Sequence, residues 1–599
     1  MVNVSVSGYG IICAIGNDAS EVLESLKAER TGIGPMRYLQ SSHKELPVGE
    51  VKLSDEEMKR ALGQDEKAII SRTVLMGAIA IRQALEHANI DIKGKRVTVI
   101  SGTTVGGMDV TERYLLQMKE NDAMLPLLEK HDCGSSTREM ADLAGLQDAE
   151  VCTVSTACSS AVNAIILGAE MLQAGETDIV VAGGTEALSR FHLNGFNALM
   201  ILDKERCRPF DKTRAGLNLG EGAAFVVLSL TSDPSPRKGE QQSSFSPLLG
   251  EGSGERLFIR GYANRCDAFH QTASSEDGEG AFLAMSEALK MAGLGPQDIQ
   301  YINAHGTGTP NNDASESAAI RRLFGDHIPP VSSTKGFTGH TTSASGSIET
   351  VICILALLDN FLPVSLGWQE QDETCITPTK YKEQCTLNNV LCNSFGFGGN
   401  DSALIIGTSP TKSLTSGEVG KACILADETI TDVEQLQDYR QFISPGEARR
   451  MGKLMKAATI TSLKALQTAG VECPDAIITA TAYGMLETSE KFLMDMLENG
   501  EETLSPTLFM QSTHNTLSSA IAIRLKCHGY NITYSQGPDS LEWALRDARR
   551  LIESGKAKTV LVGCHDEATP AFQDLFRRLG KPIPPMLYSR SILLAAEEK

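Results

Sequence analysis

The sequence predicts a layered α/β fold made of several units, and three observations support this prediction. Runs typical of strands alternate with runs typical of helices through residues 1–230, and the alternation resumes at Leu257 and continues to residue 408. Part of this pattern is repeated near the end of the chain. The 599 residues also exceed what one hydrophobic core accommodates, so more than one unit is expected.

The most informative element is a strand, turn and helix around Cys158. Residues 151–155 (VCTVS) are typical of a buried strand, and apolar residues recur at helical spacing from 161 to 172. Gly175 predicts the end of this helix, and residues 179–183 (IVVAG) predict the next strand. Cys158 is thus expected near the free N–H groups of a helix start. That position lowers the pKa of a thiol, so Cys158 is a candidate nucleophile.

Composition and periodicity divide the chain into five segments. Residues 1–230 and 257–408 carry the α/β alternation and are called the main domain here. Between them, residues 231–256 (TSDPSPRKGEQQSSFSPLLGEGSGER) are rich in Ser, Pro, Gly and Glu, which is typical of a flexible surface insertion. Residues 409–420 are predicted to be a linker. Residues 421–599, the C-terminal unit, are predicted to be a further α/β unit.

The C-terminal unit is similar in sequence to the first half of the main domain. Residues 153–160 (TVSTACSS) align without gaps with residues 533–540 (TYSQGPDS), and the register continues through the following helix and strand. Pro538 takes the place of Cys158 in this register. The unit is therefore predicted to be a catalytically silent half-copy. Its apolar strands are expected to be covered by packing against the main domain or a partner chain.

Bulk properties exclude several function classes. A net charge of −20 argues against nucleic acid as a partner. No run approaches the roughly 18 apolar residues of a membrane span. The fourteen cysteines include no C-x-x-C pair, so neither a zinc site nor a disulfide framework is indicated. The reducing cytoplasm is the expected location.

Three further segments place polar side chains in glycine-rich turns: residues 301–309 (YINAHGTGT), 332–340 (SSTKGFTGH) and 393–399 (NSFGFGG). Each has an ordinary explanation when taken alone, because lone histidines are mostly structural and glycine turns permit positive φ. By the same reasoning His514 and His565 of the C-terminal unit, which have no such motif beside them, are expected to be structural.

Taken together, the segments resemble a known family. The order Cys158, HGTGT (305–309), KGFTGH (335–340) and NSFGFGG (393–399) resembles the β-ketoacyl-acyl carrier protein synthase family, of the type with a Cys-His-His triad. RPFD at 208–211 also stands where that family has it. Over the main domain the resemblance implies the thiolase-like fold, a layered αβαβα arrangement with duplicated halves. The C-terminal unit would add a degenerate α/β half-copy.

The resemblance implies an acyltransferase that catalyses decarboxylative Claisen condensation of a Cys-bound acyl chain with malonyl-ACP, in fatty acid or polyketide/polyene biosynthesis. Cys158 would attack an acyl thioester to form the acyl-enzyme. His305 and His340 would donate hydrogen bonds to the thioester oxygen of the enolate left by decarboxylation. The backbone N–H groups of Cys158 and Phe397 would stabilise the tetrahedral oxyanion.

The other site residues follow from the same resemblance. Lys335 is expected to orient the site through the network around the histidines, and Glu349 to tie this network together. Thr307 and Thr309 match threonines that contact the pantetheine arm, and Phe397 also matches a side chain that gates the acyl pocket. No metal and no resident cofactor are implied, because the phosphopantetheine is carried by the partner ACP.

The implied partners are an acyl carrier protein, malonyl and acyl thioesters, and a second synthase-like chain in a homodimer or heterodimer. A carrier protein is acidic, so it should meet a local basic patch of this acidic chain. Lys204, Arg206 and Arg208 form the densest basic cluster of the main domain, and Arg208 matches a family position near the entrance. We expect the carrier protein to dock there.

Two alternatives stay open. A thiolase acting on acyl-CoA would carry a second cysteine in a Cys-x-Gly-x-Gly turn, whereas the corresponding turn, residues 395–399 (FGFGG), has none. A non-catalytic, chain-length-factor-like partner subunit would lack the nucleophile. Cys158 argues against this function for the main domain, and Pro538 favours it for the C-terminal unit.

Overall fold

The structure, a computed structural model, describes residues 3–231, 256–380, 385–411, 420–437 and 439–597. The predicted insertion therefore lies outside the described residues except for its two end residues, and so does most of the predicted linker.

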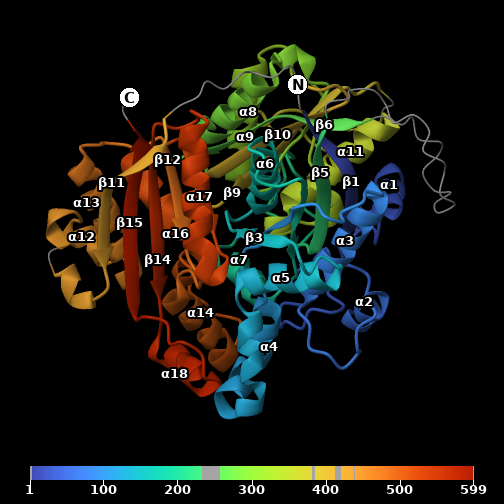
Figure 1. Ribbon diagram of the computed structural model, residues 1–599. Helices are drawn as coiled ribbons and strands as arrows, with labels where there is room; N and C mark the ends of the chain where they lie inside the picture. Colours follow the sequence, from blue (N-terminus) through green and yellow to red (C-terminus); the bar gives the residue numbers. More distant parts are fainter. Residues whose placement is uncertain (1–2, 232–255, 381–384, 412–419, 438, 598–599) are drawn as a thin grey trace.

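The described strands form one 15-stranded sheet (Figure 1). It consists of three units of five strands each. When the strands of a unit are numbered in chain order, their order across the sheet is third, second, fourth, fifth and first in all three units. In each unit the third, second and fourth strands are parallel, and the fifth and first are antiparallel to their neighbours. The strands of the first unit are β1 (Asn3–Cys13), β2 (Val97–Gly102), β3 (Glu150–Val154), β4 (Ile179–Glu186) and β5 (Gly222–Thr231); of the second, β6 (Leu257–Cys266), β7 (Tyr301–Asn303), β8 (Val331–Ser332), β9 (Asn389–Gly396) and β10 (Asn400–Gly407); of the third, β11 (Ala422–Ile430), β12 (Ala476–Ala480), β13 (Tyr530–Tyr534), β14 (Thr559–Glu567) and β15 (Leu587–Ala596).

Helices cover both faces of the strands. The helices of the first unit are α1 (Ala19–Lys27), α2 (Asp55–Ala61), α3 (Arg72–Ala88), α4 (Met108–Glu120), η1 (Asp122–Lys130), α5 (Cys133–Leu143), α6 (Ser160–Gln173) and α7 (Arg190–Ala198). Those of the second are α8 (Glu279–Ala292), η2 (Pro296–Asp298), α9 (Pro310–Phe324), α10 (Lys335–Thr338), η3 (Thr342–Ala344) and α11 (Ser345–Asp359). Those of the C-terminal unit are η4 (Val433–Leu436), η5 (Tyr439–Gln441), α12 (Pro445–Ala448), α13 (Lys453–Ala469), α14 (Leu486–Asn499), α15 (Pro506–Met510), α16 (Thr516–Leu525), η6 (Gly537–Asp539), α17 (Ser540–Glu553) and α18 (Pro570–Leu579).

The layers follow from which faces of the helices are apolar. Helices α6 and α11 are buried around their whole circumference, and they share one core cluster with strands of both halves of the main domain. The outer layers are formed by α3 with α5 over the first unit and by α8 with α9 over the second. The main domain is therefore an αβαβα fold with duplicated halves, and the predicted thiolase-like class is confirmed.

One helical stretch needs a comment because the sequence analysis expected no membrane-spanning run. Within the described residues, Thr342–Asp359 is long and apolar enough to cross a membrane by length and composition. However, 89% of this stretch is buried inside the fold, where α11 forms the central layer. A core helix explains its composition.

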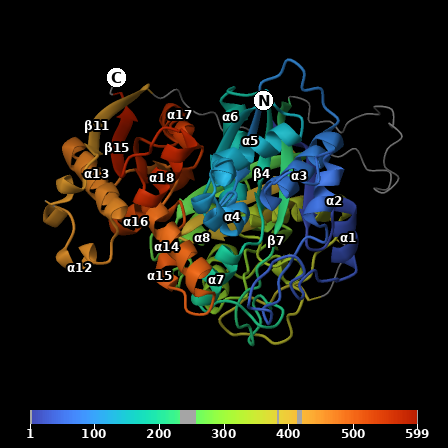
Figure 2. The same ribbon diagram turned by 90° about the horizontal axis from the view of Figure 1, so that it is seen from below.

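The C-terminal unit packs on the main domain, which is one of the two arrangements that the sequence left open (Figures 1 and 2). Strand β13 pairs antiparallel with β3 at Tyr534 and Val154. The N–H of Ser155 donates to the carbonyl of Thr533 at 2.9 Å, and the N–H of Ser535 donates to the carbonyl of Thr153 at 3.0 Å. In the repeat alignment Ser535 is the counterpart of Ser155, and Thr533 of Thr153. The two hydrogen bonds are thus related by a local twofold axis.

Ion pairs follow the same twofold relation. Lys556 pairs with Glu170 at 2.6 Å, and Arg550 pairs with Glu176 at 2.9 Å. In the repeat alignment Arg550 is the counterpart of Glu170, and Lys556 that of Glu176. Because each acidic position of α6 and its following turn has a basic counterpart in the C-terminal unit, the two copies are complementary in charge across their interface.

Candidate active site

Cys158 lies in the turn between β3 and α6 and is 6% exposed. Ala157 before it has φ of +53°, a strained conformation for a residue with a side chain. The turn between β9 and β10 approaches the same point, since a Cβ on Gly396 would lie 2.6 Å from the carbonyl oxygen of Thr156. Glycine at 396 therefore lets the backbone of Phe397 reach the nucleophile turn.

The electrostatics of Cys158 differ from the expectation based on the helix start. Burial raises the pKa of the Cys158 thiol to about 12, and the charge of Lys335 and a hydrogen bond from the backbone N–H of Phe397 offset only part of this effect. The expected lowered pKa is therefore wrong for the free protein, because desolvation of the thiolate outweighs the groups that stabilise it.

His340 is the partner of this thiol. Its Nε2 lies 3.1 Å from Cys158 Sγ, and its Nδ1 lies 2.9 Å from the hydroxyl of Ser345. The His305 ring lies nearly perpendicular to that of His340, with 5.3 Å between the ring centroids. Burial is the main cause that holds the pKa of both histidines well below its ordinary value, so both rings are neutral.

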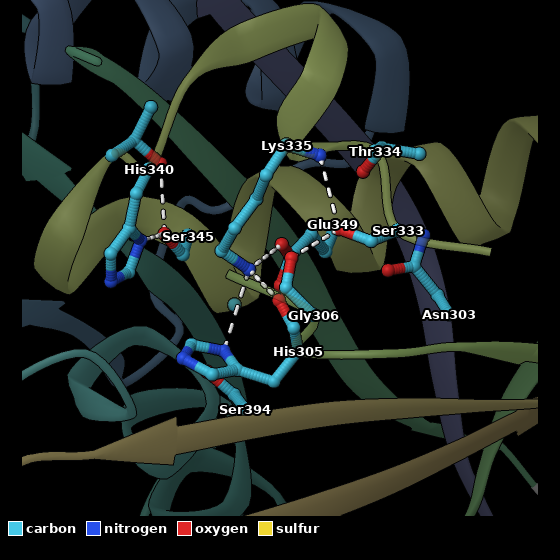
Figure 3. A network of polar contacts seen from close by, with 12 residues as sticks. Asn303, His305, Gly306, Ser333, Thr334, Lys335, His340, Ser345, Glu349 and Ser394 are labelled. Atoms are coloured by element: carbon cyan, nitrogen blue, oxygen red, sulfur yellow. Dashed lines mark hydrogen bonds and ion pairs between the residues drawn. The ribbon is translucent and has the colours of Figure 1, made fainter. Parts of the chain in front are cut away.

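Lys335, at the start of α10, lies between His305 and Glu349 of α11 (Figure 3). Its Nζ donates to Glu349 Oε1 and to the carbonyl of His305, both at 2.5 Å, and lies 3.4 Å from His305 Nδ1. An ammonium group can only donate, so Nδ1 of His305 accepts and the neutral ring carries its hydrogen on Nε2. The network thus gives His305 a defined N–H donor.

The loop after β7 holds His305 and the two predicted threonines. The carboxylate of Glu316 accepts from the backbone N–H groups of His305 and Gly306 at 2.9 and 2.8 Å, which fixes the start of the loop. The hydroxyls of Thr307 and Thr309 lie 2.8 Å apart on the same loop. The structure thus places both threonines on the loop that carries His305, with their hydroxyls in contact.

Phe397 is half-buried and stacks on Phe196 of α7, with 5.8 Å between the ring centroids. Two residues of α16 and its N-terminal end hold the turn that carries it. Asn515 Nδ2 donates to the carbonyl of Phe397 at 2.8 Å, and Ser519 lies so close that a Cβ on Gly398 would be 1.9 Å from its hydroxyl oxygen. The C-terminal unit therefore positions a turn of the main-domain site.

A small pocket of about 20 Å³ adjoins Cys158. Three of its lining residues, Phe509, Ser512 and Thr513, belong to the C-terminal unit. Sequence analysis did not find these three residues, because no motif spacing connects them with Cys158. The internal repeat is the sequence signal that points to this region, since it predicts an interface between the two copies.

The counterpart of the nucleophile turn in the C-terminal unit keeps its geometry without its chemistry. Gly537 has φ of +56°, like its counterpart Ala157, and Pro538 follows it. Pro538 lines a separate cleft of about 460 Å³ together with polar residues such as Asp132 and Arg138. This cleft contains neither a cysteine nor a histidine among its lining residues.

Of the two histidines that the sequence analysis singled out in the C-terminal unit, His514 is half-buried and His565 is fully buried. His514 Nδ1 lies 3.1 Å from the carbonyl of Thr104, and burial lowers its pKa to about 4. His565 Nδ1 lies 2.9 Å from the hydroxyl of Ser589, and burial lowers its pKa to about 3. These contacts agree with the predicted structural roles.

The predicted basic cluster is only partly available. Arg208 pairs with Glu205 at 2.7 Å and lies 3.4 Å from Asp203, so its charge is balanced within the fold. Lys204 and Arg206 are exposed.

Comparisons with known proteins identify the class to which this fold and site belong. The sequence model of the β-ketoacyl synthase N-terminal domain matches residues 1–233, and that of the β-ketoacyl synthase C-terminal domain matches residues 257–369. A second β-ketoacyl synthase N-terminal domain model matches residues 427–594. The chain therefore belongs to the β-ketoacyl synthase family.

Individual relatives match mainly the main domain. The chain is 32% identical to 3-oxoacyl-[acyl-carrier-protein] synthase 2 of Coxiella burnetii over 427 residues, which cover 67% of this chain and 98% of the relative. It is 30% identical to nodulation protein E of Rhizobium meliloti, with the same coverage.

Solved structures give the same result and extend it to the C-terminal unit. A ketosynthase of Xenorhabdus doucetiae, solved in complex with its chain length factor, is 28% identical with a TM-score of 0.57 and matches 68% of this chain and 98% of its own. The PfaC keto synthase-chain length factor matches 100% of this chain and 78% of its own with a TM-score of 0.77. At 16% identity the latter match shows the fold alone.

Proposed function

We propose that the protein is a β-ketoacyl-ACP synthase, an acyltransferase that joins an acyl group held on Cys158 to the two-carbon unit of malonyl-ACP. The observation that carries this proposal is the buried contact of Cys158 with His340 at 3.1 Å, beside a His305 ring oriented by Lys335. The names of the relatives in Coxiella burnetii and other bacteria support the same reaction.

In the first half-reaction the sulfur of Cys158 attacks the carbonyl carbon of an acyl-ACP thioester. His340 keeps its hydrogen on Nε2, 3.1 Å from Cys158 Sγ, and this N–H stabilises the sulfur as it loses the thiol proton and the carbon–sulfur bond forms. Collapse of the tetrahedral intermediate breaks the bond to the carrier sulfur, which receives the proton. The backbone N–H groups of Cys158 and Phe397 stabilise the oxyanion in between.

In the second half-reaction malonyl-ACP loses carbon dioxide, and the electrons of the broken bond form an enolate of the acetyl thioester. His305 and His340 donate N–H hydrogen bonds to the enolate oxygen. The enolate carbon attacks the acyl carbon, and the tetrahedral intermediate releases β-ketoacyl-ACP and the Cys158 thiolate, which takes up one proton. Lys335 and Glu349 keep the donors oriented, and Thr307 with Thr309 contact the pantetheine arm.

The partners follow from this chemistry. An acyl carrier protein delivers both thioesters, and its phosphopantetheine is the only carrier group, so the enzyme needs no resident cofactor or metal. The C-terminal unit takes the place of the second synthase-like subunit within the same chain, and Phe397 gates the pocket between the two. The cytoplasm suits the enzyme because Cys158 has to stay reduced.

The reaction is tested with purified full-length protein, malonyl-ACP and an acyl-ACP panel, with β-ketoacyl-ACP measured by mass spectrometry. Wild-type protein should form product, and Cys158→Ala, which keeps a small buried side chain, should lower the rate by at least about a thousandfold because covalent catalysis is lost. Product formation by the alanine variant at the wild-type rate would refute Cys158 as nucleophile. Absence of product from the wild type with every carrier substrate would favour a non-catalytic scaffold.

A further inference from the structure

The pocket beside Cys158 combines apolar walls with residues whose polar atoms have no partner within the described residues. Its walls include four phenylalanine rings, and Phe196 lies 5.8 Å from Phe397 and 5.4 Å from Phe509, measured between ring centroids. The third contact, between Phe191 and Phe509, is 5.9 Å. These rings come from both copies and form the apolar walls of the pocket.

His192 lines the same pocket from the first turn of α7. It is 3% exposed, and its Nε2 has no hydrogen-bond partner among the described residues. Its ring is flanked by Phe191 and Phe196, each 6.4 Å away between centroids, so neither neighbour can satisfy the ring nitrogen. An imidazole nitrogen buried among phenylalanines is costly unless a bound group satisfies it.

Thr342 supplies a second polar atom. It lines the pocket, is 4% exposed, and its hydroxyl likewise lacks a partner within the described part of the chain. Its φ of +46° is unusual for a β-branched residue, and the strain is stored two residues after His340. Two residues, each with a buried polar atom that lacks a partner in the described part of the chain, thus line one small pocket next to the nucleophile.

Lining by phenylalanine alone would suit a plain hydrocarbon chain, but such a chain would leave both atoms without a hydrogen bond. We infer that the acyl group held on Cys158 carries an oxygen function on its chain, a hydroxyl or a keto group, that bonds to His192 and Thr342. A neutral imidazole can donate from Nε2 and a threonine hydroxyl can both donate and accept, so either kind of oxygen is accommodated. This inference rests on the proposed synthase function and narrows its substrate class to oxygenated chains.

The test is competitive acylation of full-length protein. Equimolar pantetheine thioesters of hexanoic, 3-hydroxyhexanoic, 4-oxohexanoic and 5-oxohexanoic acid are mixed with the protein, and the acyl groups on Cys158 are quantified by intact-protein mass spectrometry. A six-carbon chain is used because it can carry the oxygen function at the third, fourth or fifth carbon. At least one oxygenated chain should be loaded about tenfold or more in preference to hexanoyl, since the unsubstituted chain leaves buried polar groups unpaired.

Variants separate hydrogen bonding from packing. His192→Leu and Thr342→Val should each reduce the preference at least about threefold, whereas His192→Gln, which keeps a polar side chain, should retain more of it than His192→Leu. Phe191→Leu is the matched control, because it alters the wall beside His192 without removing a polar atom. It should leave the ratio between oxygenated and plain chains unchanged.

Three outcomes would overturn the inference. Hexanoyl loaded as well as every oxygenated chain would mean that water satisfies the two polar atoms. A preference for oxygenated chains that persists in both His192→Leu and Thr342→Val would mean that other residues cause it. If none of the four thioesters acylates Cys158, the synthase function itself is refuted, and this inference with it. Acylation without a preference for oxygenated chains refutes only this inference, so the two failures can be distinguished.

Discussion

Lys335 and Glu349 form an ion pair that is buried from solvent, with side-chain exposures of 1% and 3%. Such a pair contributes little net stability, but removing one partner leaves a buried charge uncompensated at a cost of about 3–5 kcal/mol. The ion pair instead serves to orient the His305 ring. The ammonium group is held by Glu349 and faces Nδ1 of His305, so the ring has one possible neutral tautomer. Two neutral imidazoles can then act as hydrogen-bond donors without any proton having to be removed first.

This arrangement predicts that the two half-reactions separate in histidine variants. His305→Ala should still accept an acyl group on Cys158 but lose at least about a hundredfold in carbon dioxide release from malonyl-ACP, because one donor to the enolate is missing. His340→Ala should show the same loss, with a smaller decrease in acylation because His340 also contacts the thiol. Acyl-enzyme is measured by mass spectrometry and decarboxylation with labelled malonyl-ACP. Decarboxylation at the wild-type rate in either variant would contradict the proposed donors.

A second prediction at this scale concerns Arg206. With Arg208 held by Glu205 and Asp203, the exposed Arg206 is the better candidate for a contact with an acidic carrier protein. Arg206→Glu should raise KM for acyl-ACP about fivefold or more, and leave KM for the corresponding pantetheine thioester nearly unchanged. Glu205→Gln is a control that alters charge at the neighbouring position. Equal effects of Arg206→Glu on both substrates would mean that the residue is an ordinary surface charge.

The elements around the nucleophile show what sequence patterns can predict. The strand expected at 151–155 and the helix expected at 161–172 correspond to β3 and α6 within about one residue at each end. Both are mainly apolar segments with clear ends, so periodicity and turn residues determine them. The pairing of β3 with β13 leaves no such pattern, because backbone hydrogen bonds between strand edges do not depend on side-chain identity. The sequence does not predict the raised pKa of Cys158 for a related reason. The burial of this thiol depends on chain segments that are far away in the sequence.

Helix α16 and the Phe397 turn provide a test of coupling between elements. Gly398→Ala adds a methyl group where Ser519 leaves no space, at a φ of +88°. We expect the turn to move, the N–H of Phe397 to leave the nucleophile, and the condensation rate to fall at least about tenfold. Gly580→Ala is the matched control, because it has φ of +71° and no atom within 4 Å of the new Cβ. The control should lose only about 1–2 kcal/mol of stability from backbone strain and keep its activity. Equal activities of the two variants would disconnect the turn from catalysis.

On the scale of the whole molecule, the chain contains its own interface partner. The three units share one strand order, and the local twofold axis passes through the contact of β3 with β13. A second main domain in place of the C-terminal unit would repeat the backbone pairing but bring Glu170 and Glu176 of both copies together. Lys556 and Arg550 instead oppose these glutamates. Like charges across an interface are unfavourable, so this face favours the C-terminal unit over a second copy of the main domain.

The last prediction follows from that preference. A chain ending at Gly417 would expose the edge of β3 and the glutamates of α6, and its pocket would lose Phe509 together with the contact from Asn515 to the Phe397 turn. We expect this truncated protein to aggregate, because an unpaired strand edge and apolar surface are uncovered and charge repulsion disfavours an orderly dimer. Light scattering measures its state, and the condensation assay measures its products. Full-length Arg550→Gln tests the same interface in the intact chain. This variant should have a lower thermal unfolding temperature, because Glu170, Glu176 and Asp547 would lose the cation that they share. A truncated protein that stays soluble and condenses the same acyl chains at the full-length rate would show that the C-terminal unit has no part in the site.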